Sequence, residues 1–175
     1  GFWPTTKNWA KGLVPNPNEI ADASGVRGAL TDKKRLISTF RMYIDKGLTD
    51  VPSFLMGDLI EIIGPGVAEA VINIVRDEDN YPGIEAYFDA MMADVAFQRS
   101  NYNRIKEYTS LAREGLPIAE ALLIARMWAL EGWAEMQLGN QEKGIANYTE
   151  AFQLDPSVFR RLGISLPVKF SVSDN

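Results

Sequence analysis

The chain has 175 residues, of which 46% are hydrophobic and 23% charged, and its formal net charge is −5. This composition predicts a globular protein rather than a disordered one, and the acidic balance argues against a nucleic-acid surface, which needs clustered lysines and arginines. The chain has no cysteine and no histidine, which excludes a disulfide framework, a zinc–thiolate site and histidine acid–base chemistry. No stretch reaches the roughly 18 apolar residues of a membrane-spanning helix.

Residues 1–28 carry proline, glycine and asparagine at turn-forming spacing, as in GFWP and PNPNE. Such segments favour irregular structure, so we predict an irregular N-terminal arm over these residues. The chain begins with Gly1 rather than methionine, and we therefore expect a processed form of a longer protein. The compartment is left open between an exported or periplasmic protein and a cytoplasmic one.

Three helices are predicted between residues 31 and 80. The first begins after Thr31, a suitable N-cap, and ends at Gly47. The second begins at Ser53, also interpreted as an N-cap, and extends to residue 63. The run Gly64-Pro65-Gly66 is expected to interrupt the helix, and a third helix follows over 67–78. The acidic residues 77–80 are interpreted as a solvated helix end, because their spacing is not that of a calcium-binding EF-hand loop.

The region from Gly83 to Gly163 predicts two helical hairpins and a short terminal helix. The first hairpin pairs 84–100 with 103–114 across a turn at 101–103. The second pairs 119–138 with 141–154 across Gly139-Asn140, and the short helix covers 157–163. Apolar residues then alternate with small or polar ones, which predicts an extended, strand-like tail over 164–175. Either this tail lies across the helices or it starts a further domain. The alternating residues are Ile164, Leu166, Val168, Phe170 and Val172.

Six residues of the second hairpin have the spacing of a known repeat. Each half carries an aromatic and a small residue, the first half ends in a turn glycine, and the second ends in a proline. These residues are Trp128, Gly132, Gly139, Tyr148, Ala151 and Pro156. The pattern resembles the tetratricopeptide repeat, a helix–turn–helix unit of about 34 residues. The clearest repeat spans 125–158. A weaker one spans 86–119, ends 39 residues earlier at Pro117, and has no turn glycine.

The resemblance implies an all-α fold, an α-α superhelix of antiparallel helical hairpins forming one domain over 29–163. In that family the first helix of each unit lines the concave surface. Carried over to this chain, this implies seven groove candidates: Asp94, Phe97, Gln98, Arg126, Trp133, Met136 and Gln137. We expect Phe97, Trp133 and Met136 to form an apolar groove for an amphipathic helix or an extended apolar peptide. Asp94 and Arg126 would flank this groove. The family's carboxylate clamp is not expected, because Ala129 and Leu130 occupy its region.

These expectations favour a non-catalytic module that binds a protein or peptide partner, with no cofactor, no metal site and no nucleic-acid binding. Two alternatives are kept. In the first, the helices form a dimerisation or spacer domain of a larger envelope or secreted protein, and the chain is a homo-oligomer. In the second, a hydrolase acts through carboxylates such as Asp89, Asp94 and Glu131, although their spacing identifies no second partner.

Overall fold

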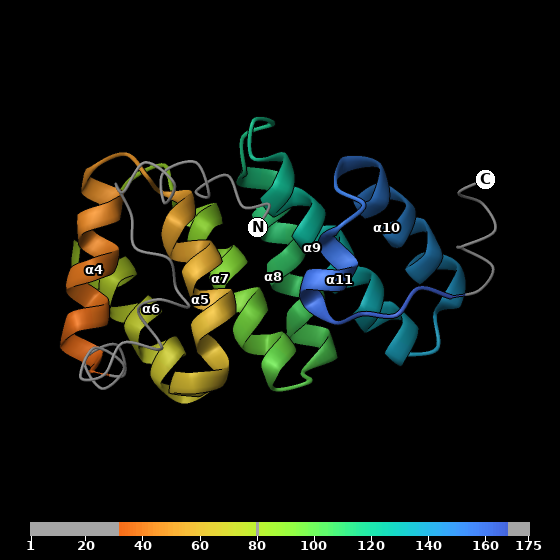
Figure 1. The fold of residues 1–175 in the computed structure, drawn as a ribbon, viewed down its shortest axis with the longest axis horizontal. Coiled ribbons are helices and arrows are strands. Elements are labelled where there is room, and N and C mark those ends of the chain that lie inside the picture. Colours follow the sequence, from red (N-terminus) through yellow and green to blue (C-terminus); the bar gives the residue numbers. More distant parts are fainter. Residues whose placement is uncertain (1–31, 80, 168–175) are drawn as a thin grey trace.

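The computed structural model describes residues 32–79 and 81–167, and this part of the chain is all-α (Figure 1). It contains eight helices and no strand. The N-terminal arm predicted for 1–28 and the last residues of the tail, 168–175, lie outside the described residues. The helices are α4 (Lys33–Asp45), α5 (Asp50–Ile63), α6 (Pro65–Asp79), α7 (Glu85–Gln98), α8 (Tyr102–Gly115), α9 (Ala121–Gln137), α10 (Gln141–Leu154) and α11 (Val158–Leu162).

The helices form two layers of an elongated array. Helices α5, α7, α9 and α11 pack on one another in that order, while α6 packs on both α5 and α7, and α8 on both α7 and α9. Helix α4 packs on α5 and α6, and α10 packs on α9. Figure 1 shows α4 at one end of the long axis and α10 at the other. The predicted architecture of stacked helical hairpins is therefore confirmed.

The start of α5 differs from the prediction. The helix begins at Asp50, so Ser53 lies inside it and is buried. The Ser53 hydroxyl donates a hydrogen bond to the backbone carbonyl of Tyr87 at 3.3 Å and thus joins α5 to α7 instead of capping a helix. Pro52 does not prevent this earlier start, because the amide that a proline lacks would have no partner in the first turn.

Two other helix boundaries lie close to their predicted positions. The first helix begins at Lys33 and is capped by Asp32, one residue after the predicted cap Thr31; the Asp32 carboxylate accepts a hydrogen bond from the Lys34 amide at 3.0 Å. The predicted break at 64–66 is confirmed: α5 ends at Ile63, its C-cap Gly64 has φ 84°, and α6 starts at Pro65. Proline at the first position of a helix costs no hydrogen bond.

The two C-terminal hairpins share one turn geometry at an offset of 39 residues. Ser100 and Gly139 have φ values of 53° and 87°. The amide that follows each turn donates to the carbonyl five residues earlier, from Asn101 to Ala96 at 2.9 Å and from Asn140 to Glu135 at 2.8 Å. The predicted turn at 101–103 is therefore placed two residues too late. The missing turn glycine of the weaker repeat is replaced by a serine in the same left-handed conformation.

Three clusters of buried apolar side chains follow one another along the array. The first is built from α4 to α7, the second from α5, α7, α8 and α9, and the third from α9, α10, α11 and the residues after them. Ile164 is buried in the third cluster and Leu166 packs against it. Residues 164–167 form neither helix nor strand. Of the two alternatives for the tail, this described part therefore follows the first: it lies across the helices, and its apolar side chains pack there instead of pairing in a sheet.

Candidate functional site

Asp94 and Arg126 do not flank an exposed groove, which corrects that part of the prediction. They form a buried ion pair between α7 and α9, with side chains 4% and 9% exposed. The Nε and Nη2 atoms of Arg126 donate to Oδ1 of Asp94 at 3.0 and 2.7 Å. Gly57 of α5 lies directly on the guanidinium, since a Cβ there would be 2.7 Å from Nη2. Burial raises the pKa of Asp94, and the attraction and hydrogen bonds of Arg126 oppose that rise.

The aromatic groove candidates pack against one another. The ring of Trp133 meets Phe97 edge-on at 4.9 Å between centroids and Tyr102 at 5.5 Å. All three are partly buried beside the second core cluster. Met136 packs on α10, where a Cβ at Gly144 would be 2.5 Å from its sulfur. These side chains therefore fill the junctions between helices, while Gln98 and Gln137 are exposed at the ends of α7 and α9.

The predicted structural positions of the repeat bring α9 and α10 together. A Cβ at Gly132 would lie 2.6 Å from Cδ1 of Tyr148 and 3.0 Å from the carbonyl oxygen of Gly144. The absence of a side chain at Gly132 is thus required for the two helices to approach this closely. Ala151 is also buried between them, Trp128 is partly buried, and Pro156 is exposed after the end of α10.

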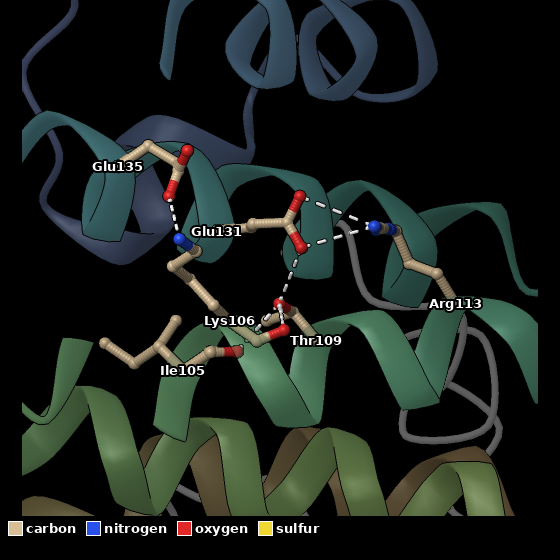
Figure 2. Close-up of polar contacts among 6 residues, drawn as sticks. All are labelled: Ile105, Lys106, Thr109, Arg113, Glu131 and Glu135. Atoms are coloured by element: carbon tan, nitrogen blue, oxygen red, sulfur yellow. Dashed lines mark hydrogen bonds and ion pairs between the residues drawn. The ribbon is translucent and has the colours of Figure 1, made fainter. Parts of the chain in front are cut away.

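A polar groove of about 400 Å³ lies between α8 and α10, with α9 as its floor. We call it the α8–α10 groove. Its charged side chains come from three helices, and Figure 2 shows those of α8 and α9 pointing toward one another. The lining residues are Lys106, Ser110 and Arg113 from α8, Glu131 and Glu135 from α9, and Lys143, Ala146 and Asn147 from α10.

Two ion pairs hold the floor of this groove. Glu135 is only 2% exposed, and its Oε1 lies 2.6 Å from the Lys106 ammonium. Glu131 receives Nη2 of Arg113 at 3.2 and 3.4 Å from its two oxygens. The Thr109 hydroxyl lies 3.1 Å from Glu131 Oε1 and 2.7 Å from the carbonyl of Ile105 (Figure 2). Both carboxylates are therefore held in place by cations from the neighbouring helix.

Arg113 is fixed on its other side by an aromatic ring. Its guanidinium carbon lies 3.7 Å from the centroid of the Trp128 ring, a distance at which a cation is attracted to the face of an indole. Its Nε and Nη1 are buried and have no acceptor among the described residues. The side chain therefore carries more hydrogen-bond donors than its surroundings use.

The charges on the floor are not required by the hairpin architecture. At the 39-residue offset, Glu131 and Glu135 correspond to Met92 and Ala96 of α7, and both of those residues are buried in the apolar core clusters. Burying an ion pair gains less than burying apolar side chains of similar size in many proteins. The second hairpin thus has charged side chains on α9 at positions where the first hairpin has apolar side chains on α7.

Sequence reasoning selected only Glu131 from this groove, and then as a candidate catalytic carboxylate. The signal was nevertheless present. Glu131 and Glu135 are four residues apart on one helix face, and Lys106, Ser110 and Arg113 have the spacing of a single stripe on α8. The sequence alone does not show which side chains of α8 face which side chains of α9, because that depends on how the two helices pack.

Comparisons of the chain with models of known protein families, with curated proteins and with solved structures find no match. Among the described residues, no group of three or more acidic side chains is placed to hold a metal ion. In the same part of the chain, none of the helices combines the length and apolar character needed to cross a membrane.

Proposed function

We propose that this protein is a non-catalytic protein–protein interaction module, a short array of helical hairpins of the tetratricopeptide type that binds a peptide or protein partner. The observation that carries this proposal is the α8–α10 groove, a concave polar site assembled from three helices. Its volume of about 400 Å³ lies within the range of about 300–1,000 Å³ that is common for pockets that bind small molecules.

The positions of the charged side chains in the α8–α10 groove support a role in binding rather than in folding. Glu135 is buried and Glu131 is half-buried, whereas their counterpart positions on α7 are apolar, so an apolar pair would also have built this hairpin. The cations that neutralise them keep part of their side chains in solvent, with Lys106 36% and Arg113 18% exposed. A partner that enters the groove meets these cations without disrupting the core.

Position-specific crosslinking tests the proposal. A photoreactive residue is placed at Asn147 in the groove and, as the control, at Lys34 on the exposed side of α4. Both proteins are illuminated in cells of the source organism, and the adducts are analysed by mass spectrometry. We expect a discrete adduct from position 147 only, with the crosslinked peptide of the partner identified. An equal pattern from both positions, or none from either, would contradict the proposal. An adduct of this chain with itself would favour the dimerisation alternative.

A further inference from the structure

The α8–α10 groove has an excess of positive charge although the whole chain is acidic. Three cations line it, Lys106, Arg113 and Lys143, against the two carboxylates of Glu131 and Glu135. Lys143 is exposed and forms no ion pair with another described residue. It lies in the first turn of α10, where the unpaired amides of a helix start add partial positive charge.

The carboxylates of the floor are unavailable to an incoming cation. Glu135 is covered by Lys106 at 2.6 Å, and Glu131 receives Arg113 and lies 3.1 Å from the Thr109 hydroxyl. A basic side chain would have to displace one of these partners and leave a cation without its counter-charge. An acidic side chain would instead meet Lys143 and the exposed part of Lys106 without displacing anything. Ser110 and Asn147 also line the groove, and both carry hydrogen-bond donors that suit a carboxylate.

From this arrangement we infer that the α8–α10 groove binds acidic side chains, those of aspartate and glutamate, on an extended segment of the partner. The inference rests on the proposed function and specifies the chemistry of the partner. Binding of a charged segment by exposed cations depends on ionic strength, and charges at the rim of an interface act mainly on the association rate. The complex should therefore weaken as salt is added.

The test is a titration of the full chain, labelled with ¹⁵N, with three probes: a hexaglutamate peptide, a hexalysine peptide and inorganic phosphate. We expect hexaglutamate to cause saturable shifts of the amide signals of residues 106–113 and 141–147, and to lose affinity as salt is raised. Hexalysine should cause none there. Saturable shifts with phosphate but not with hexaglutamate would overturn the inference in favour of a free-anion site. Equal shifts with both peptides would also overturn it.

Two charge reversals give a matched comparison. Lys143→Glu changes the groove, whereas Lys33→Glu makes the same charge change on an exposed residue of α4. We expect Lys143→Glu to weaken hexaglutamate binding about tenfold more than Lys33→Glu does, the effect of replacing one attraction with one repulsion at a partly solvated site. Equal effects of the two variants would show that net charge alone is responsible and would overturn the inference.

The two proposals fail in different experiments. If crosslinks form at Asn147 but hexaglutamate does not bind, the interaction module stands and the acidic chemistry of its partner is wrong. If hexaglutamate binds but no crosslink forms in cells, the groove is an anion site and the proposed function is wrong.

Discussion

Ser100 occupies a backbone conformation that residues with a side chain rarely adopt. Its φ of 53° lies in the left-handed region, where the Cβ comes close to the backbone. The equivalent position of the next hairpin is Gly139, with φ 87°, which has no Cβ to clash. The same turn is thus built once with a glycine and once with a strained serine.

We expect Ser100→Gly to stabilise the protein by about 1 kcal/mol, since relief of left-handed strain outweighs the added freedom of the unfolded chain. The change is measured as a higher midpoint of urea unfolding. Ser110→Gly serves as the control, because this serine lies inside α8 and a glycine there should cost about 0.5 kcal/mol. A Ser100→Gly variant with an unchanged or lower midpoint would show that the turn does not strain the serine.

At the scale of helices, a buried ion pair joins α7 to α9. Asp94 and Arg126 are almost fully covered, and Gly57 of α5 packs on the guanidinium. The three helices α5, α7 and α9 therefore meet at one charged contact. Removal of one partner leaves a buried charge without compensation, whereas removal of both leaves an apolar site.

We expect Arg126→Met to lower the free energy of unfolding by about 3–5 kcal/mol, the range for breaking a buried pair. The double variant Asp94→Leu with Arg126→Met should recover most of this loss. Urea unfolding of both single variants and of the double variant forms a complete cycle. The double variant should be no better than Arg126→Met if the pair carries no coupling energy, and that result would contradict the prediction.

The short helix α11 is held by a second, smaller network. Asp155 accepts hydrogen bonds from the amide and hydroxyl of Ser157 at 3.1 and 2.7 Å, and it pairs with Nη2 of Arg161. Burial raises the pKa of Asp155, but the hydrogen bonds from Ser157 and Arg161 and the charge of Arg161 outweigh this and hold the pKa below 3.8. The charged carboxylate is therefore favoured in the folded state.

A carboxyl group with a lowered pKa stabilises the fold above its unfolded pKa, and this contribution is lost as the pH falls through the folded pKa. We therefore expect Asp155→Asn to cost about 1.5–3 kcal/mol at pH 7, the range for a hydrogen bond to a charged group. The difference from the unchanged protein should shrink progressively below pH 3.8. Urea unfolding of both proteins between pH 7 and pH 2.5 measures it. A difference that stays constant over this range would refute the role of the charge.

At the scale of the molecule, the core is divided along the array. The three apolar clusters follow one another from α4 to α11, and each is shared only by neighbouring helices. Arrays of this kind gain stability from contacts between adjacent units, and a local defect is then felt mainly by its neighbours. The two ends of the helical array are therefore expected to differ in local stability.

We expect Gly132→Ala to destabilise the C-terminal part selectively. The new Cβ would overlap the Tyr148 ring and the Gly144 carbonyl, and overpacking of this kind typically costs about 1–3 kcal/mol. Hydrogen exchange should accelerate in α9, α10 and α11, with little change in α4, α5 and α6. Gly66→Ala is the matched control, since nothing lies within 4 Å of its added Cβ. Equal acceleration in all helices would show one cooperative unit instead.

The local order of this protein could be predicted from its sequence. The break at Gly64-Pro65, the turn at Gly139 and the hairpin built around Gly132 and Tyr148 all depend on backbone freedom or on neighbours close in the chain. Such effects leave a readable pattern. The turn at Ser100 was predicted two residues too late, because a serine, unlike a glycine, is not a sequence signal for a left-handed conformation.

The candidate site depended on the tertiary structure. Helix α7 buries every residue from Ala90 to Ala96, so its hydrophobic pattern does not show which face is free. Asp94 was therefore predicted to flank an exposed groove, whereas it is buried in an ion pair with Arg126. The ion pair between Lys106 and Glu135 was not predicted. Sequence determined which residues share a helix face, because the period of the helix is local. Only the packing of α8 and α10 over α9 decided which faces meet, because that contact joins residues far apart in the chain.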